Sequence, residues 1–263
     1  MAHSVEHPAV SYSGLTKRFA DTLAVDDVTI DIPLGCFFGI VGPNGAGKTT
    51  MLRMTTGLLR PDAGTVSIAG HDVWEDPATA KTRFGVVPDN PTMFERLTGR
   101  ELIEFNGMMR DMDPEVIAQR RESLLRLLDL TEAGDTIVAD YSLGMTKKIA
   151  IACALLHNPS VLFLDEPFAG VDPVARQTLE QILRRHIAGG GTVVFSDHAM
   201  DVVERLCDRI MVIDHGQVLA TGSTEEITGG RRLQDVFVEM VGAQITEEGD
   251  LEWLGSSPDS SSG

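Results

Sequence analysis

The sequence predicts an α/β fold with a largely parallel sheet, and three patterns lead to this prediction. Short apolar runs alternate with helix-like segments from residue 161 to residue 213. A glycine-rich stretch at residues 42–50 joins an apolar run to a helix-like segment. Strand-like runs are missing between residues 91 and 140, which indicates an inserted helical segment.

The N-terminal region is rich in β-type runs. They cover residues 9–12, 23–32 and 36–41, and a Pro33 to Gly35 turn separates the last two. After Lys48 the apolar residues follow helical spacing until a turn signal, RPDAG, at residues 60–64. The glycine stretch should therefore connect a buried strand to a helix.

The rest of the chain alternates in type. Helices are predicted at 99–112 and 114–130, the second with Asp113 as N-cap before Pro114. The remaining predicted elements are a strand at 161–164, a helix at 173–186, a strand at 192–195, a helix at 200–207 and a strand at 209–213. We expect one domain over residues 1–240, with a helical insertion at about 90–150. The acidic, Ser/Gly-rich tail at 241–263 is expected to be disordered.

Composition argues against several function classes. The chain has 263 residues, with 22 Lys plus Arg against 39 Asp plus Glu and a formal net charge of −17, which disfavours binding to nucleic acid or anionic lipid. Three widely spaced cysteines and no secretory signal fit a reducing compartment. The longest apolar run, residues 149–156, is far shorter than the ~20 residues that span a bilayer. We expect a cytoplasmic protein that reaches a membrane only through a partner.

The stretch GPNGAGKTT indicates a phosphate site. Gly42, four further residues, Gly47, Lys48 and Thr49 match the full P-loop pattern, between a strand and a helix as that pattern requires. Glycines let backbone N–H groups surround phosphate oxygens, and the following helix adds its positive N-terminal end. Lys48 is expected to hold the β- and γ-phosphates, and the Thr49 hydroxyl to bind Mg²⁺.

Two carboxylates follow a second buried strand. The run VLFLDE places Asp165 and Glu166 at its end. Asp165 is expected to bind Mg²⁺, directly or through water, and Glu166 to activate the water that attacks the phosphate. Taken alone, this run is equally compatible with a strand that enters a solvated turn. The P-loop favours the catalytic interpretation.

Tyr141-Ser142-Leu143-Gly144-Met145, shortly before these carboxylates, resembles the signature motif of ABC transporter nucleotide-binding domains. The resemblance covers residues 8–240, in a variant similar to ABC-2-type exporter ATPases, multidrug and bacitracin-resistance types included. It implies a P-loop NTPase core with a mostly parallel sheet, an N-terminal antiparallel β subdomain and an inserted α-helical subdomain. In this family Ser142 and Gly144 would face ATP bound by the other subunit.

Three further residues gain a role from the resemblance. Asp172 resembles the D-loop aspartate, and His198 the switch histidine that contacts the γ-phosphate. Phe19 resembles the aromatic that stacks on adenine. Without the resemblance, a lone histidine such as His198 after a strand is more often a surface or capping residue. The alternative for Phe19 is an ordinary core phenylalanine.

The sequence departs from the common family pattern at three positions. Asp89 occupies the Q-loop position, where the family has glutamine or, in this subgroup, often glutamate. It could reach Mg²⁺ through water and would repel the γ-phosphate without metal, so we expect a strong Mg²⁺ dependence, unless it is a loop acid without a nucleotide role. Leu143 and Met145 replace glycine and glutamine. Because Ser142 and Gly144 remain, we expect an active composite site rather than a degenerate one; the alternative is pairing with a different ATPase subunit.

A docking surface for a membrane subunit is expected at Met93, Phe94 and Leu97, unless these residues are buried under the insertion. Residues 233–237, LQDVF, resemble the C-terminal motif of the same exporter subgroup. No nucleic acid partner is expected.

The resemblance implies an ATP- and Mg²⁺-dependent ATPase subunit that powers an exporter through ATP-driven dimerisation. Its partners would be a second ABC ATPase subunit, in a homodimer or heterodimer, and integral membrane permease subunits that hold it at the inner face of the cell membrane. The expected site comprises the catalytic residues Lys48, Glu166 and His198, the nucleotide-binding residues Phe19, Gly42, Pro43, Asn44, Gly45, Ala46, Gly47, Lys48, Thr49, Thr50, Ser142, Gly144 and Asp172, and the metal-binding residues Thr49, Asp89 and Asp165.

Two other function classes compete with this one. A soluble ABC ATPase acting on nucleic acid or ribosomes is disfavoured by the single domain, the short insertion and the charge of −17. A module that binds ATP without turnover is disfavoured by the presence of Glu166.

Overall fold

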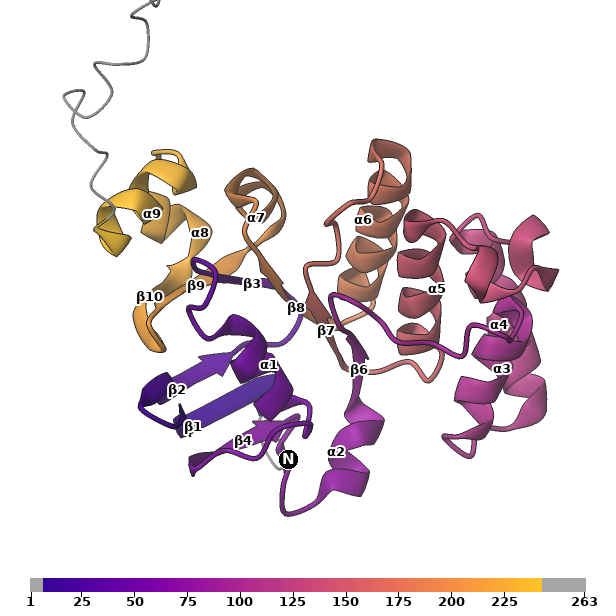
Figure 1. The fold of residues 1–263 in the computed structure, drawn as a ribbon, viewed down its shortest axis with the longest axis horizontal. Coiled ribbons are helices and arrows are strands. Elements are labelled where there is room, and N and C mark those ends of the chain that lie inside the picture. The colour runs from indigo at the N-terminus through magenta and orange to yellow at the C-terminus, as the bar shows by residue number, and fades with distance from the viewer. Residues whose placement is uncertain (1–6, 243–263) are drawn as a thin grey trace, which may run out of the picture.

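The computed structural model describes residues 7–242, which form two β-sheets and the helices around them (Figure 1). The smaller sheet consists of β1 (Val10–Phe19), β2 (Thr22–Ile32), β4 (Ala63–Ile68) and β5 (His71–Asp72). The larger sheet consists of β3 (Phe37–Val41), β6 (Phe84–Val87), β7 (Val161–Asp165), β8 (Thr192–Asp197), β9 (Arg209–Asp214) and β10 (Gln217–Ser223). The tail expected at 241–263 lies outside the described residues from 243 onward.

The strand orders are β2-β1-β4-β5 in the smaller sheet, which is antiparallel, and β10-β9-β3-β8-β7-β6 in the larger one. In the larger sheet every neighbouring pair is parallel except β9 and β10 at one edge. The predicted mostly parallel core and N-terminal antiparallel subdomain are confirmed.

Helices cover both faces of the larger sheet. They are α1 (Lys48–Thr55), α2 (Pro77–Arg83), α3 (Gly99–Met108), α4 (Pro114–Leu127), α5 (Leu143–Leu155), α6 (Pro173–Ala188), α7 (Met200–Leu206), α8 (Thr224–Thr228) and α9 (Leu233–Val241), with 3₁₀ turns at Glu132–Asp135 and Val138–Asp140. Within residues 7–242, none of these helices has the length and apolarity needed to cross a bilayer.

Side-chain alternation in β3 divides the interior into two cores. Phe37 and Val41 pack with apolar residues of α5, α6 and α7. Phe38 and Ile40, which point the other way, pack with α1 and the smaller sheet. Because each helix contributes to only one of these cores, α1 and α5 lie on opposite faces of the larger sheet.

The parallel strands also fix where loops can meet. Residue pairing places Val41 opposite Asp197, and Asp165 opposite Ser196. The carboxyl ends of β3, β8 and β7 therefore lie along one edge of the sheet. In open α/β sheets this edge is the usual place for ligands.

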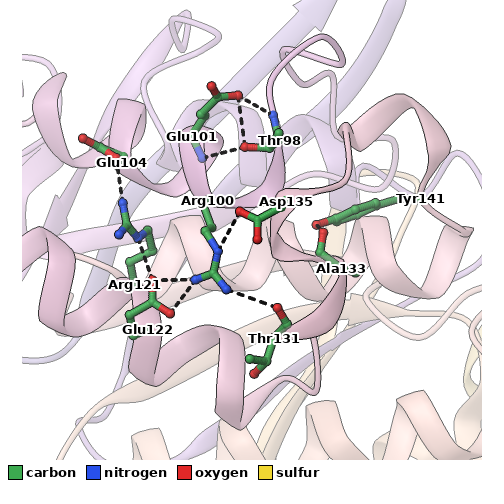
Figure 2. Close-up of polar contacts among 10 residues, drawn as sticks. All are labelled: Thr98, Arg100, Glu101, Glu104, Arg121, Glu122, Thr131, Ala133, Asp135 and Tyr141. Atoms are coloured by element: carbon green, nitrogen blue, oxygen red, sulfur yellow. Dashed lines mark hydrogen bonds and ion pairs between the residues drawn. The ribbon is translucent and has the colours of Figure 1, made fainter.

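The inserted helices lie at one end of the molecule, away from the smaller sheet (Figure 1). The guanidinium of Arg100, on α3, joins them (Figure 2). It donates hydrogen bonds to a Glu122 carboxylate oxygen at 2.6 Å, to Asp135 Oδ1 at 3.0 Å and to the Thr131 carbonyl at 3.2 Å. One side chain thus ties α3 to α4 and to the 3₁₀ turn that follows α4.

The same region anchors Tyr141, the residue before α5 and its N-cap Ser142. The Tyr141 hydroxyl donates to the Ala133 carbonyl at 2.7 Å (Figure 2). A Cβ atom on Gly99 would lie 2.2 Å from that hydroxyl oxygen, so this position of Tyr141 requires glycine at the start of α3. The insertion thereby fixes where α5 begins.

Two parts of the fold differ from the expectation. The first strand extends to Phe19 instead of ending near Tyr12, and register shifts interrupt it between Tyr12 and Leu15, both of which are buried. These irregularities break the period of two by which a strand is recognised. Residues 65–87, for which no element is predicted, contain β5, α2, β6 and most of β4.

Candidate active site

The loop at residues 42–50 connects β3 to α1. Gly47, the N-cap of α1, has φ 108°, and a Cβ there would lie 2.2 Å from the Ala24 carbonyl oxygen. A Cβ on Gly42 would lie 2.2 Å from the Ile213 carbonyl oxygen. Both glycines are thus required for the loop to pack against β2 and β9. Within the described chain no side chain caps α1, which leaves its first N–H groups to a bound anion.

The Lys48 ammonium lies over this loop. It is 7% exposed and donates to the carbonyls of Gly42 at 2.7 Å and Pro43 at 3.0 Å. Burial lowers the pKa of Lys48, and nearby carboxylates, above all Glu166 and then Asp165, oppose that shift. The cation therefore faces a cluster of acids even before an anion binds.

Thr49, in the first turn of α1, contacts Asp165 at the carboxyl end of β7. The Thr49 hydroxyl donates to Asp165 Oδ2 at 3.1 Å, and the Ser196 hydroxyl donates a short hydrogen bond to the other carboxylate oxygen. Asp89 lines the same cavity, of about 230 Å³, as Thr49 and Asp165. The three residues predicted to bind metal thus border one space.

This oxygen set suits Mg²⁺ rather than a metal held by protein alone. Residues 7–242 contain no cluster of three or more His, Cys, Asp or Glu side chains arranged to hold a metal. Mg²⁺ usually takes one or two carboxylates and completes its shell with water and substrate phosphates. Thr49 and Asp165 fit that requirement, because both present hard oxygen atoms beside the phosphate loop.

Glu166 and His198 form a second pair at the same edge. His198 Nδ1 lies 3.3 Å from Glu166 Oε1, and the two side chains are 59% and 25% exposed. Glu166 has a left-handed backbone, φ 46°, and its N–H donates to the Ser196 carbonyl at 3.0 Å. The Glu166 backbone is fixed by this hydrogen bond, while its carboxylate stays partly exposed to solvent, so a water molecule can reach it.

Sequence reasoning missed Ser196 and Asp197, which lie between these groups. Asp197 is 3% exposed, accepts from the Ala199 N–H at 2.9 Å and lies 3.9 Å from His198 Nδ1. Burial raises its pKa. The signal was a Ser-Asp pair directly before a histidine, but the prediction ended the strand at residue 195.

Ser142, Gly144 and Asp172 form a separate cluster. The Ser142 hydroxyl caps α5 by accepting from the Met145 N–H at 3.3 Å. Asp172 caps α6 by accepting from the N–H groups of Val174 and Ala175, and these bonds lower its pKa. A Cβ on Gly144 would lie 3.5 Å from Asp172 Oδ2. Within residues 7–242 neither Ser142 nor Asp172 forms a side-chain hydrogen bond to the phosphate loop, so the predicted residues fall into two groups.

Comparison with known proteins assigns this arrangement to a family. A family model described as ABC transporter matches residues 25–169. This chain belongs to the ABC transporter family. Because the ATP-binding domain of that family hydrolyses ATP, the predicted ATPase activity is confirmed with the family.

Named relatives support the assignment. This ABC ATPase is 36% identical over 234 residues to the daunorubicin resistance ATP-binding protein DrrA3 of Streptomyces coeruleorubidus. The aligned residues cover 88% of this chain and 74% of that protein. It is 37% identical over 220 residues to the Nod factor export ATP-binding protein I of Ralstonia nicotianae, covering 84% and 68%. A solved ATP-binding subunit of an ABC transporter superposes with a TM-score of 0.83 at 29% identity, covering 89% of this chain and 99% of that one.

Leu143, the first residue of α5, lies against the loop that carries Gly170. The side chain is 50% exposed, and its Cδ2 would lie 2.6 Å from a Cβ on Gly170, which has φ 68°. A side chain at position 170 would therefore displace the end of Leu143 from this contact. Because Gly170 has no side chain, its loop has room for Leu143, which stands where the common family pattern has glycine.

Phe19 lies at the end of β1 and is 47% exposed, so the alternative of a core phenylalanine is wrong. The Lys17 ammonium lies 5.6 Å from its ring centroid. Stacking of this ring on adenine stays a prediction.

The expected docking residues divide between surface and interior. Phe94 is 60% exposed and packs edge-on against Phe105, with 4.9 Å between ring centroids. Met93 and Leu97 pack against the core of the insertion instead. Phe94 also borders a cavity of about 190 Å³ between its loop and α5.

Proposed function

We propose that this chain is the ATP-hydrolysing subunit of an exporter, and that ATP drives its pairing with a second ABC ATPase subunit. One observation carries the proposal. Lys48, Thr49, Asp165, Glu166 and His198 lie at one edge of the larger sheet, whereas within residues 7–242 no side-chain hydrogen bond joins Ser142, the N-cap of α5, to any of them. A site split in this way is completed when a second subunit presents its own Ser142.

ATP would bind on the loop at 42–50. The N–H groups at the start of α1 and the Lys48 ammonium would hold the phosphates, and Phe19 would stack on adenine. Thr49 and Asp165 would hold Mg²⁺, with Asp89 reaching it through water. When bound, the metal supplies positive charge to the β- and γ-phosphate oxygens.

Hydrolysis would proceed by attack of water on the γ-phosphorus. A new P–O bond forms to the water oxygen, the bond to the β-phosphate oxygen breaks, and Glu166 orients the water and accepts its proton. Lys48 and His198 would face the charge that develops on the transferred group. Asp197, buried beside His198, would keep that imidazole at the strand end.

Pairing would add the second half of the site. The Ser142 hydroxyl, the Gly144 N–H and the start of α5 offer donors and a positive helix end to a γ-phosphate. Asp172 would link the two sites. Leu143 and exposed Val174 flank these groups and would be covered by the second subunit.

Export and membrane attachment are proposed from the relatives, which are named for daunorubicin resistance and Nod factor export. Separate membrane subunits would dock where Phe94 is exposed and would hold the chain at the inner face of the cell membrane.

The test is the mass in solution of Glu166→Gln, measured by size exclusion with light scattering, with and without Mg²⁺-ATP. Replacement of the carboxylate should trap bound ATP, so conversion of monomer to dimer is expected only with nucleotide. Ser142→Arg in the same background should block conversion while leaving ATP binding intact. A variant that binds ATP and stays monomeric would overturn self-pairing and favour a different ATPase subunit.

A further inference from the structure

Lys147 is a buried cation in the second turn of α5. Its side chain is 2% exposed, although a lysine in this place lies near the positive end of a helix and has lost its contact with water. Burial of a lysine side chain is costly unless its donors find hydrogen-bond partners. The sequence gives no sign of this burial, because lysines in a helix are usually solvated.

The partners of Lys147 come from the two loops that border the candidate active site. Its ammonium donates to the Asp89 carbonyl at 2.6 Å and to the Glu166 carbonyl at 3.1 Å, and Asp89 Oδ1 lies 3.5 Å away. An ammonium has three donors, and here three acceptors surround it. One side chain of the insertion thus joins the end of β6 to the end of β7.

The contact acts on a backbone that is already constrained. Glu166 has φ 46°, and its N–H is held by the Ser196 carbonyl. Its carbonyl accepts from Lys147 and, at 3.2 Å, from the Ala169 N–H. The direction of the Glu166 side chain follows from the orientation of these two peptide groups. Loss of the ammonium would leave the Glu166 carbonyl held by the Ala169 N–H alone.

We propose that Lys147 is a positioning residue that couples the loop carrying Asp89 to the catalytic geometry of Glu166. This inference rests on the role of Glu166 in the proposed function. Movement of the Asp89 loop, which continues to the exposed Phe94, is transmitted through the Lys147 ammonium to the Glu166 peptide. A partner that shifts this loop would thereby change hydrolysis without touching ATP.

The experiment compares Lys147→Met with Glu166→Gln and the double variant in the full-length chain. ATP turnover and the dissociation constant for ATP are both measured. We expect Lys147→Met to lower kcat about 10- to 100-fold, since misplacement of a catalytic group by about 1 Å has effects of that size. ATP affinity should change less than about twofold, because within residues 7–242 Lys147 makes no hydrogen bond to the phosphate loop. In the Glu166→Gln background the same change should add little.

Matched variants separate positioning from folding. Lys148→Met removes the adjacent buried lysine, which makes no hydrogen bond to either loop within residues 7–242, and should keep kcat within about threefold. Lys147→Arg retains a donor and should recover part of the turnover. Should Lys147→Met fail to fold in a thermal melt, Lys147→Gln takes its place.

The outcomes distinguish two failures. If Glu166→Gln turns over ATP like the wild type, the proposed role of Glu166 fails. If Glu166→Gln lowers turnover but Lys147→Met keeps the kcat of the wild type, the positioning role of Lys147 is wrong. The role is also wrong if Lys147→Met lowers the residual turnover of Glu166→Gln by the same factor as it lowers that of the wild type.

Discussion

His198 Nδ1 lies 3.3 Å from the carboxylate of Glu166, although the two residues follow different strands, β8 and β7. Adjacent parallel strands bring them together, with Asp165 paired opposite Ser196. Strand pairing therefore holds the imidazole beside the carboxylate that we propose activates water. The position of His198 is thus set by the pairing of β7 with β8, which no local pattern around the histidine reveals.

We expect His198→Ala to lower kcat for ATP roughly 100-fold while ATP still binds, because a group facing the transferred phosphate acts mainly in the transition state. Steady-state turnover and nucleotide titration measure the two quantities. His215→Ala is the control, since that imidazole is 92% exposed and pairs with Asp214 away from the pair described above. Equal turnover of both variants would mean that the His198 contact is incidental.

Asp89→Gln should weaken the dependence of ATP hydrolysis on Mg²⁺. The carboxylate borders the cavity shared with Thr49 and Asp165, so its charge attracts the metal and repels a γ-phosphate without it. We expect the Mg²⁺ concentration for half-maximal rate to change roughly two- to tenfold, a modest effect because the group is partly solvated. Glu95→Gln, in the same loop and exposed, is the control. An unchanged metal dependence in Asp89→Gln would leave Asp89 without a metal role.

Gly170→Ala should destabilise the fold by roughly 2 kcal/mol, through a left-handed backbone at φ 68° and a clash with Leu143. Urea denaturation gives the free energy of unfolding. Gly190→Ala isolates the backbone contribution, because its φ is 90° and no heavy atom lies within 4 Å of the added Cβ.

The clash itself is tested by a second substitution. Leu143→Ala in the Gly170→Ala background should restore about half of the lost stability, since only the steric part depends on the leucine. Simple additivity of the two substitutions would show that Leu143 moves aside at no cost.

His157 should make stability depend on pH. Its Nε2 lies 3.0 Å from the Phe84 carbonyl, and burial, reinforced by Arg110, lowers its pKa to about 4. The unfolded chain therefore binds a proton that the folded chain does not between about pH 6.5 and pH 4. The stability is fully present above pH 6.5 and is lost as pH falls through this window.

We expect wild type to lose about 1–2 kcal/mol more than His157→Gln between pH 7.5 and pH 5. Urea unfolding at the two pH values measures this difference. If the free energy of unfolding depends on pH equally in the wild type and in His157→Gln, the imidazole is in contact with water.

The sequence allowed prediction of where the contiguous parts of the candidate site lie. The phosphate loop, Asp165 and Glu166 each occupy a short segment whose chemistry is visible in its spacing. The grouping of Ser196 with Asp165, and of Lys147 with Asp89 and Glu166, arises from strand pairing and from the docking of the insertion. These contacts join segments far apart in the chain, so no local pattern reports them.

The same reason explains the elements that were not predicted. β6 has only four residues, and β5 only two, so neither is long enough to show a period. Lys147 and Lys148 precede an apolar run and read as solvated, but the packing of the insertion on the larger sheet buries both. Their hydrophobic stems pack in the interior, as long cationic side chains can.

The backbone of Glu166 has a consequence for any effort to engineer this protein. A glutamate at φ 46° has a conformation that glycine and asparagine adopt more readily, at a difference of about 1–2 kcal/mol. A library screened for heat resistance alone would therefore favour replacement of Glu166. If Glu166 has the role proposed above, the survivors would melt at a higher temperature and no longer hydrolyse ATP. A screen on this scaffold must therefore include hydrolysis from its first round.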